Sequence, residues 1–256
     1  MLYSLLKKRE RKIPLHKKST NLIDDDNEVY GEYNVFVGIE DQKASYDLFQ
    51  TSYSYLDRYS DIKPYKFNTV KISSKSGYIN ASPINIRDKK NYFISTQGPK
   101  PETVEDFWTM VYDYNSKVIV MLCKVTEGDR RKCENYWEAK NMKNFSVKVE
   151  KEENFDMYII RTIKLKNLTN KEEKTVYQLH FIGWPDHGIP DTKNGTVFEV
   201  FSEMNRKVDE FNTNKNPIVV HCSAGVGRTG TFVSMYLLEK EIMKQINDKV
   251  EVIRVN

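Results

Sequence analysis

The 256-residue sequence is poor in cysteine and lacks long apolar runs. It contains three cysteines, Cys123, Cys133 and Cys222, and so odd and sparse a set provides no disulfide framework. No apolar run approaches the roughly 18 residues of a membrane span. The N-terminus, Met1–Lys8, has too short an apolar core for a secretory signal. We therefore expect a cytoplasmic protein without a membrane span.

A strong excess of charge is also missing. The formal net charge is +4, although 30% of the residues are charged. So small a basic excess suits an anionic ligand but argues against a nucleic-acid partner. Hydrophobic residues make up 39% of the chain, which is enough to bury a core, and 256 residues suffice for one large domain.

The first part of the chain differs from the rest. Residues 1–42 are polar and largely aperiodic, which predicts an irregular lead-in before a domain over residues 43–256. The basic cluster Lys7–Lys12 is typical of a nuclear address or of a patch for anionic surfaces, but also of a solvated terminal arm. These interpretations stay open.

Residues 43–256 alternate between strand and helix patterns. Short β-branched or alternating runs predict strands, and the continuous apolar run 118–122 predicts a central strand buried on both faces. One helix is predicted to start at Pro101, with acidic residues in its first turn. The predicted strands are 70–72 paired with 78–81, 92–95, 118–122, 145–148, 157–165, 175–181 and 217–220, and the other helices are 194–211 and 229–246. The pattern favours a single α/β domain on a mixed sheet.

The stretch Pro217–Gly230 combines a predicted strand, a loop with Gly225 and Gly227, and the start of a helix. This arrangement directs backbone N–H groups at an anion, and a row of such groups binds phosphate without a metal. Arg228 adds a planar fork of donors that matches phosphate oxygens. The same field is expected to lower the pKa of the Cys222 thiol from about 8.5 into the range of about 3.5–7.5, which makes a nucleophile. The plainer interpretation is a buried cysteine beside an ordinary glycine turn.

The pattern His221-Cys222-x5-Arg228-Thr229 resembles the signature loop of the cysteine-dependent protein tyrosine phosphatases, in its tyrosine-specific form. Other stretches resemble landmarks of this family in the family's order, namely Tyr78–Ala81, Gln97–Pro99, Phe107–Trp108, Cys133 with Tyr136–Trp137, and Trp184–Gly188. The resemblance implies a strongly twisted mixed β-sheet flanked by helices. It also implies that phosphate binds at the carboxyl edge of the sheet, on Ser223, Ala224, Gly225, Val226, Gly227 and Arg228.

The resemblance further implies roles for individual residues. Cys222 is expected to be the nucleophile that forms a phosphocysteine intermediate, and Asp186, on a mobile loop with Trp184, is expected to be the general acid. His221 is expected to order the signature loop, and Thr229 to help break down the intermediate. The other expected site residues are the substrate-binding Tyr59 and Asp61, Glu127 as the partner of Arg228, and Lys132 near the mobile loop. No metal and no cofactor is expected.

Plainer roles remain as alternatives for several of these residues. Asp186 lies in a sequence that also suits an ordinary surface turn, and Thr229 also suits a helix cap. A surface position without a role in the site is the alternative for Tyr59, Asp61, Glu127 and Lys132.

Three features depart from the family pattern. Asp57 stands where the family usually has Asn, and Lys66 and Thr69 replace a usual Asp and Arg, so the rigidity and peptide preference of the substrate loop are open. The sequence also stops at Asn256, before the helices and the glutamine-bearing loop that positions the hydrolytic water in the family. We therefore expect hydrolysis of the phosphocysteine to be the slow step.

Two classes of function remain. The first is a protein-tyrosine phosphatase that acts, as a monomer, on phosphotyrosine-containing proteins. The second is a weakly active or inactive relative that binds and shields phosphotyrosine. A dual-specificity phosphatase is disfavoured by Tyr59 and by Tyr78–Ala81, since Tyr59 resembles the family tyrosine that makes the pocket deep. The short C-terminal part and the richness in Lys, Asn and Ile resemble the tyrosine phosphatase-like proteins of polydnaviruses (bracoviruses). That resemblance implies action in the cytoplasm of host immune cells, where it would dampen tyrosine-kinase signalling.

Overall fold

The computed structural model describes residues 53–86, 89–185, 188, 190 and 196–248. Residues 48–236 cluster as one compact unit. The other described residues, 237–248, belong to a second unit and include the end of helix α5 (Gly227–Asn247). The predicted lead-in, residues 1–42, and the start of the predicted domain lie outside the described residues.

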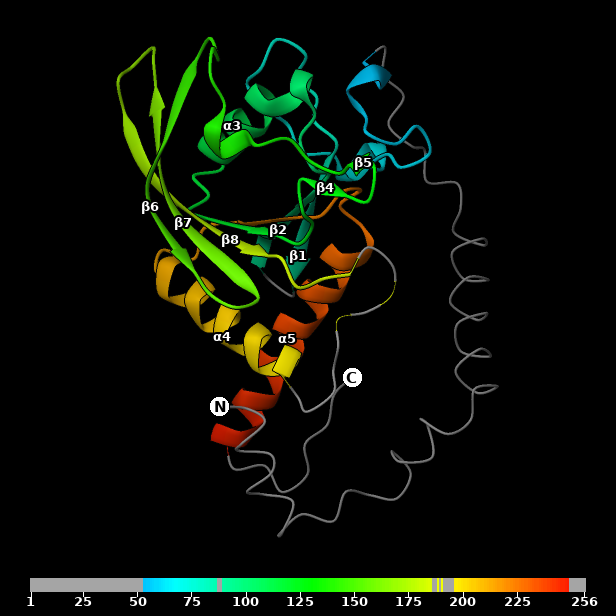
Figure 1. The fold of residues 1–256 in the computed structure, drawn as a ribbon, viewed down its shortest axis with the longest axis vertical. Helices are drawn as coiled ribbons and strands as arrows, with labels where there is room; N and C mark the ends of the chain where they lie inside the picture. Colours follow the sequence, from blue (N-terminus) through cyan, green and yellow to red (C-terminus); the bar gives the residue numbers. More distant parts are fainter. Residues whose placement is uncertain (1–52, 87–88, 186–187, 189, 191–195, 249–256) are drawn as a thin grey trace. The chain divides into compact units, whose positions relative to one another are not determined.

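A seven-stranded sheet forms the centre of the 48–236 unit (Figure 1). Strands β2, β9, β3 and β8 run parallel to one another, and the outer strands pair antiparallel with their neighbours. In spatial order the strands are β1 (Ala81–Ile86), β2 (Lys89–Thr96), β9 (Ile218–His221), β3 (Val118–Met121), β8 (Glu173–Phe181), β7 (Tyr158–Asn167) and β6 (Phe145–Asn154). A separate short hairpin consists of β4 (Thr126–Glu127) and β5 (Arg130–Arg131).

The middle strands are apolar because they are covered on both faces. Every residue of β3 and β9 is buried. In register, Val220 of β9 lies between Ser95 of β2 and Val120 of β3. The predicted central strand is therefore confirmed, and a continuous run of β-branched and apolar residues is what such a position selects.

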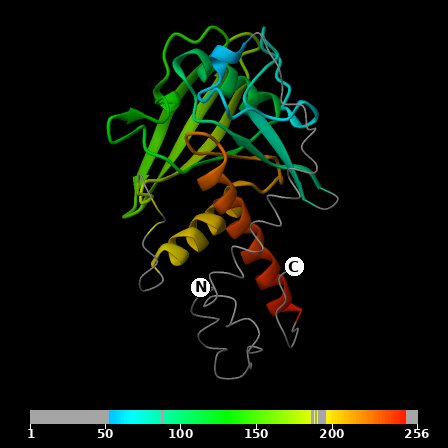
Figure 2. The same cartoon turned by 90° about the vertical axis from the view of Figure 1, so that its right-hand side faces the viewer.

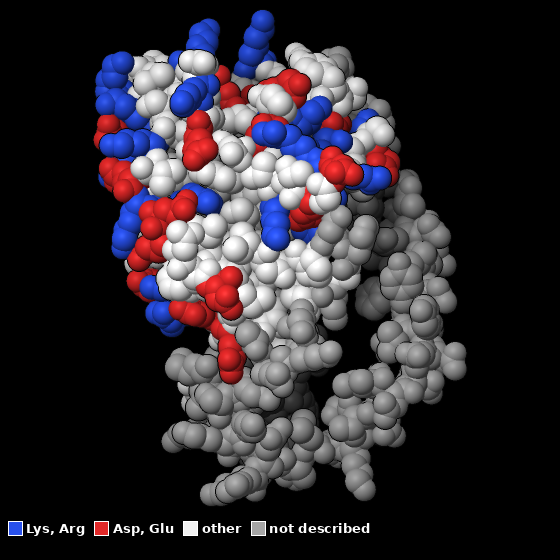
Figure 3. All heavy atoms as spheres, viewed as in Figure 1, with Lys and Arg blue, Asp and Glu red and all other residues white. Residues whose placement is uncertain are grey.

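Strands β6, β7 and β8 carry many charged residues. They are longer than predicted, and their cross-strand neighbours form ion pairs, such as Lys166–Glu173 at 2.8 Å and Lys164–Glu150 at 3.9 Å. Figure 3 shows acidic and basic side chains interspersed along the side of the molecule that these strands form. This part of the surface therefore has no field of one sign.

Both edges of the sheet are irregular. The edge strand β6 shifts its register against β7 between Val149 and Lys151. The opposite edge strand, β1, contains Pro83 and shifts its register against β2 between Ile84 and Ile86. Proline lacks a backbone donor and is tolerated in a sheet at such an edge.

Helices cover both faces of the sheet. Figure 1 shows α3 (Val104–Asp113) on one side, and α4 (Thr196–Phe211) with the first turns of α5 on the other, while Figure 2 shows α4 and α5 from the side. Phe107 of α3 packs on the ring of His221, with ring centres 5.8 Å apart, and Phe201 of α4 packs on Phe181 at 4.9 Å. None of the helices in the described part of the chain is both long and apolar enough to cross a bilayer.

The helix predictions are confirmed, with small shifts at the ends. A 3-10 turn, Pro101–Thr103, precedes α3, as a proline in the first turn suggests. The predicted helix 194–211 is observed from Thr196, and residues 194–195 lie outside the described residues. Helix α5 begins at Gly227, two residues before the predicted start. The other 3-10 turns are η1 (Ser54–Leu56), η2 (Lys66–Asn68) and η4 (Tyr136–Glu138).

The prediction of paired strands at 70–72 and 78–81 is confirmed only in part, since the two segments pair antiparallel at Lys71 and Tyr78 and the Val70 N–H donates to the Ala81 carbonyl at 3.0 Å, but no ladder forms. The two segments share a single isolated bridge, between Lys71 and Tyr78, and a strand starts only at Ala81. The Ala81 N–H donates to the Ile79 carbonyl at 2.8 Å, which closes a tight turn. The side chain of Asn80 donates to Asp57 and to a backbone carbonyl, and these contacts replace a ladder that the alternation of apolar residues had suggested.

Candidate active site

The candidate site lies where the parallel strands end. In register, Thr96 of β2, His221 of β9 and Met121 of β3 form the last pairs of their ladders. The next residues, Gln97–Pro99, Cys222–Arg228 and Leu122–Glu127, therefore meet at one edge of the sheet. In open α/β sheets this carboxyl edge is where ligands bind.

The Cys222–Arg228 loop, which we call the signature loop, needs glycine at Gly225. Gly225 has a φ of +78°, and a Cβ atom there would lie 2.3 Å from the Thr96 carbonyl oxygen. The Ser95 hydroxyl donates to the Gly225 carbonyl at 2.5 Å, which fixes the turn against β2. Since α5 starts at Gly227, its first N–H groups have no acceptor within the helix and point out of its N-terminus.

The Cys222 thiol lies at the bottom of this loop. Its side chain is buried, with 5% of the residue exposed. Its sulfur accepts a hydrogen bond from the Gly225 N–H at 3.3 Å and one from the Thr229 hydroxyl at 3.4 Å. Both donors stabilise negative charge on sulfur, so the geometry suits a thiolate.

Arg228 is held by a bidentate ion pair with Glu127. Its NH1 and NH2 donate to the two carboxylate oxygens at 2.5 and 2.9 Å, and NH1 also donates to the Leu122 carbonyl at 3.2 Å. Burial lowers the pKa of Arg228, but hydrogen bonding to Glu127 and its charge outweigh burial, and the net effect raises that pKa. The amine of Lys132 lies 4.0 Å from the same carboxylate. The fork of Arg228 is thereby oriented before any anion binds.

His221 is fully buried behind the signature loop. Its Nε2 is 2.9 Å from the Tyr136 hydroxyl, and its Nδ1 is 3.1 Å from the Cys222 carbonyl oxygen. Burial lowers the pKa of His221 to about 3, so the ring is neutral at physiological pH. The role of His221 is therefore one of hydrogen bonding and not of charge.

The rim of the site is formed by the loop after η1. The Tyr59 hydroxyl bonds to the Ser223 hydroxyl at 2.8 Å, and Ser223 in turn donates to the Lys132 carbonyl at 3.1 Å. Asp61 is exposed beyond Tyr59. The structure thus brings Tyr59 to the signature loop and leaves Asp61, two residues further along the chain, exposed.

Arg58 is a residue of this rim that the sequence did not reveal. Its guanidinium donates to the carbonyls of Gly98 at 2.8 Å, Pro99 at 2.7 Å and Arg131 at 3.2 Å. It therefore ties its own loop to the segment Gly98–Pro99 and to Arg131. Its partners are backbone atoms, which leave no pattern of residue types in the sequence.

The loop with Trp184 and Pro185 lies against Arg228. The Trp184 side chain is buried, its indole N–H donates to the Gly188 carbonyl at 3.2 Å, and Arg228 donates to the Pro185 carbonyl at 3.2 Å. Asp186, the expected general acid, lies outside the described residues.

These features agree with comparisons to known proteins. Residues 54–255 match the family model described as "Protein-tyrosine phosphatase". The chain belongs to the protein-tyrosine phosphatase family.

Relatives of this family match over most of the chain. Receptor-type tyrosine-protein phosphatase eta of Mus musculus is 40% identical over 196 residues, which cover 72% of this chain and 16% of the relative. Tyrosine-protein phosphatase non-receptor type 2 of Homo sapiens is 34% identical over 195 residues, which cover 72% of this chain and 46% of the relative. The chain thus spans less than half the length of these relatives.

A solved structure supports the same assignment. The catalytic domain of human protein tyrosine phosphatase non-receptor type 18 superposes with a TM-score of 0.76 and 28% identity, and the match covers 88% of this chain and 84% of that one. The predicted fold, a twisted mixed sheet flanked by helices, is thereby confirmed as that of a protein-tyrosine phosphatase domain.

The departure from the family pattern at Asp57 has a structural counterpart. Its carboxylate is buried and accepts hydrogen bonds from the Tyr78 hydroxyl at 2.5 Å and from the Asn80 amide at 2.9 Å. Burial, followed by hydrogen bonding to Asp57, raises the pKa of Tyr78. The carboxylate therefore fixes the start of the substrate loop to the segment before β1.

The other two cysteines of this phosphatase domain are also buried near the site. Cys123 and Cys133 are 1% and 0% exposed. Hydrogen bonding to Cys133, together with burial, raises the pKa of Cys123 well above the usual value. Cys123 therefore differs from Cys222, whose sulfur accepts two hydrogen bonds.

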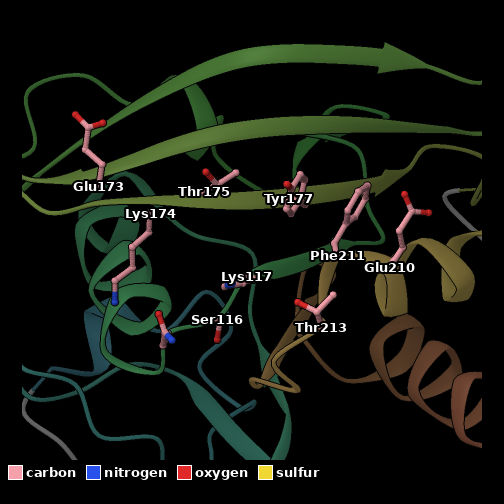
Figure 4. A pocket seen from close by; sticks show the side chains of 10 residues that line it. Ser116, Lys117, Glu173, Lys174, Thr175, Tyr177, Glu210, Phe211 and Thr213 are labelled. Carbon is pink, nitrogen blue, oxygen red and sulfur yellow. The ribbon is translucent and has the colours of Figure 1, made fainter.

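A polar hollow of about 470 Å³ lies at the amino ends of the parallel strands, near the starts of β3 and β8 (Figure 4). The candidate site lies at their carboxyl ends. Three of the four charged residues that line the hollow are engaged with neighbours. Lys174 donates to the Tyr112 carbonyl at 3.2 Å, Glu173 pairs with Lys166 at 2.8 Å, and Glu210 pairs with Lys207 at 3.2 Å. The hollow thus offers no concentrated positive charge for a phosphate.

We expect Cys222 to be the first of the three cysteines to react with iodoacetamide near neutral pH. Its sulfur accepts two hydrogen bonds, whereas Cys123 has a raised pKa and Cys133 is fully buried. Phosphate or vanadate should slow this reaction by occupying the signature loop. Peptide mass mapping over time would measure it, with Cys222→Ser as the control. A first reaction at Cys123 or Cys133, without protection by anions, would show that the site is assigned wrongly.

The buried histidines predict a pH dependence of stability. Burial lowers the pKa of His221 to about 3 and that of His180 to about 4, so below pH ~6.5 the unfolded chain binds more protons than the folded one. Their contribution is complete above pH ~6.5 and is lost as the pH falls towards these values. Between pH 6.5 and 5 the free energy of unfolding should fall by up to about 1.4 kcal/mol per pH unit for each histidine. Urea unfolding of the native chain and of His180→Gln would test this, since equal slopes for both proteins would contradict it.

Proposed function

We propose that this chain hydrolyses phosphotyrosine in proteins through a phosphocysteine intermediate on Cys222. The observation that carries the proposal is the geometry of the Cys222 sulfur. It accepts two hydrogen bonds at the base of a loop whose Arg228 is already oriented by Glu127. The family to which the chain belongs supports the same reaction.

In the first step, the Cys222 thiolate attacks the phosphorus of phosphotyrosine. The sulfur–phosphorus bond forms while the bond from phosphorus to the phenolic oxygen breaks. The N–H groups of the signature loop and the fork of Arg228 bind the phosphoryl oxygens, where charge is spread in the transition state. Asp186 gives its proton to the phenolic oxygen, because a phenolate with a pKa of about 10 leaves poorly.

In the second step, a water molecule attacks the phosphorus of phosphocysteine. The phosphorus–oxygen bond forms, the sulfur–phosphorus bond breaks, and the proton of the water passes to the Asp186 carboxylate. The leaving sulfur regains negative charge, and the Thr229 hydroxyl, 3.4 Å away, donates a hydrogen bond to it. His221 holds the loop, and inorganic phosphate departs.

Tyr59 is proposed to select phosphotyrosine. It stands at the rim of the loop, tied to Ser223, so that a long aromatic ester reaches Cys222 and a short phosphoserine does not. Asp61, exposed beside it, is proposed to bind the peptide backbone. Trp184 and Lys132 are proposed to support the loop that carries Asp186.

We expect Asp186→Ala to lower kcat by about 10²–10⁴-fold and to change substrate binding much less, since proton transfer matters in the transition state alone. Phosphate release from a phosphotyrosine peptide measures this. Cys222→Ser, which removes the nucleophile, is the inactive control. Pull-downs with Asp186→Ala should retain phosphotyrosine proteins. Unchanged turnover in Asp186→Ala would remove this residue from the mechanism.

Rapid mixing separates the two classes of function. A phosphatase whose second step is slow releases about one phenol per active site in a burst and then turns over slowly, and acid quenching traps labelled phosphate on Cys222. Binding of the phosphopeptide without a burst and without turnover would overturn the proposed reaction in favour of a module that shields phosphotyrosine.

We further propose that the protein acts as a cytoplasmic monomer that dampens tyrosine-kinase signalling in host immune cells. This part rests on the sequence resemblance to polydnavirus phosphatase-like proteins. Expression in insect blood cells should lower total phosphotyrosine after immune stimulation, whereas Cys222→Ser should not. Equal phosphotyrosine in both cases, measured by immunoblot, would contradict it.

A further inference from the structure

A chain of buried hydrogen bonds connects strand β7 to the signature loop. Its outer end is Arg161, which is 6% exposed. The Arg161 Nε donates to Glu152 on the neighbouring strand at 2.7 Å, and its guanidinium lies 4.5 Å from the ring centre of Trp137. Removing a guanidinium from water is costly, and an apolar side chain at this position in the sheet would avoid that cost. The presence of a buried arginine here therefore suggests a specific role.

The first link of the chain fixes the orientation of an amide. Arg161 NH1 is 2.9 Å from Gln178 Oε1. Arginine can donate but never accept, so this contact directs the oxygen of Gln178 to Arg161 and its nitrogen away. That nitrogen, Nε2, is 2.7 Å from the Tyr136 oxygen and must donate to it.

The next links fix a tautomer. Because Tyr136 accepts from Gln178, its own proton is available for His221 Nε2, which lies 2.9 Å away. The Met121 sulfur, 3.9 Å from the same hydroxyl, is the weaker acceptor of the two. Nε2 is then an acceptor and carries no proton. A neutral imidazole has one ring proton, so that of His221 must be on Nδ1, which donates to the Cys222 carbonyl at 3.1 Å.

A second branch from the same guanidinium gives the opposite tautomer at His180. Arg161 NH1 is 3.2 Å from His180 Nδ1, which must therefore accept. The proton of His180 is then on Nε2, which donates to the Cys123 carbonyl at 2.9 Å. Burial also keeps this ring neutral, since its pKa is lowered to about 4. One arginine thus sets the direction of both branches.

The carbonyl of Cys222 belongs to the peptide unit that carries the Ser223 N–H. In a trans peptide the C=O and the N–H point in opposite directions. While His221 holds the Cys222 oxygen towards the core, the Ser223 N–H points the other way, away from His221. Without that hydrogen bond the peptide is free to turn its oxygen, which repels a phosphate, towards the anion.

We propose that Arg161 and Gln178 are positioning residues that act through Tyr136 to keep the His221 proton on Nδ1 and so orient the peptide after Cys222 for phosphate. The inference rests on the proposed function for the part that concerns phosphate. The tautomers themselves are independent of activity.

Gln178→Glu tests the direction of the relay with little change in shape. The introduced carboxylate accepts from both Arg161 and Tyr136, so the Tyr136 proton turns to it. Tyr136 then can only accept from His221, whose proton must move to Nε2. Long-range ¹H–¹⁵N correlation spectra of the full chain, which has four histidines, distinguish the two tautomers. His180, still held by Arg161, should remain protonated on Nε2 and serves as the internal reference.

The kinetic effect should follow the tautomer. For Gln178→Glu we expect kcat/KM towards a phosphotyrosine peptide to fall by about 10–100-fold, the range found when groups that orient metal-binding histidines are changed. Inorganic phosphate should also bind more weakly. Gln178→Met is the matched control, because it removes the relay without placing an acceptor beside Tyr136, so its effects on the His221 tautomer and on kcat/KM should be smaller than those of Gln178→Glu. Arg161→Lys, which also only donates, should keep both native tautomers.

The native chain alone can overturn the proposal. A native His221 protonated on Nε2 would do so, and so would an unchanged His221 tautomer in folded Gln178→Glu, with circular dichroism to establish folding. If Gln178→Glu does not fold, the native spectrum and that of Arg161→Lys decide. A native chain that shows the expected tautomers but no phosphatase activity would contradict the proposed function and would still support the relay. An active chain with the wrong tautomers would contradict the relay and would still support the proposed function.

Discussion

The site depends on the parallel pairing of β9 between β2 and β3. This pairing places Thr96, His221 and Met121 at one level, so that three loops leave the sheet together. Carbonyls of the loops after β2 and β3 hold Arg58 and Arg228, respectively, and the loop after β9 contains Cys222 and enters α5. A shift of β9 by one residue would turn its side chains to the opposite faces of the sheet and carry the thiol away from its donors.

Buried charge is the second constraint on this fold. Glu127 and Arg161 both lie at 6% exposure, and each is paired with a group of opposite charge. Such pairs contribute little net stability, but loss of one partner leaves an uncompensated charge that costs about 3–5 kcal/mol. Their value therefore lies in orientation. Glu127 aims a fork of donors at the loop, and Arg161 sets the direction of every hydrogen bond beyond it.

How much the sequence predicts depends on how local the interaction is. The strand, glycine turn and helix around Cys222 follow one another in the chain, so their residue types are enough to predict them. The central strand β3 can be predicted in the same way, because burial on both faces requires an unbroken apolar segment. By contrast, the segments 70–72 and 78–81 alternate like strands. What decides their structure is Asp57, more than ten residues away, whose carboxylate holds Tyr78 and Asn80.

The hydrogen bonds behind the signature loop could not be predicted from the sequence either, because their partners are far apart in the chain. Arg161 contacts Gln178 because the two are register partners on β7 and β8. Gln178 in turn donates to the hydroxyl of Tyr136, which belongs to the 3-10 turn η4. No spacing in the chain encodes such a register. The contacts of Arg58 could not be predicted either, because its acceptors are main-chain carbonyls, which every residue provides.

The two irregular edges have a consequence for the behaviour of the chain in concentrated solution. A long, flat edge strand exposes unpaired N–H and C=O groups that another chain can extend, which is a route to aggregation. Here β1 lacks a donor at Pro83, and β6 is broken in register near Lys151 and carries closely spaced charges of both signs. Neither edge of the described sheet is a good template for a further strand, so these edges do not favour the stacking of one chain on another.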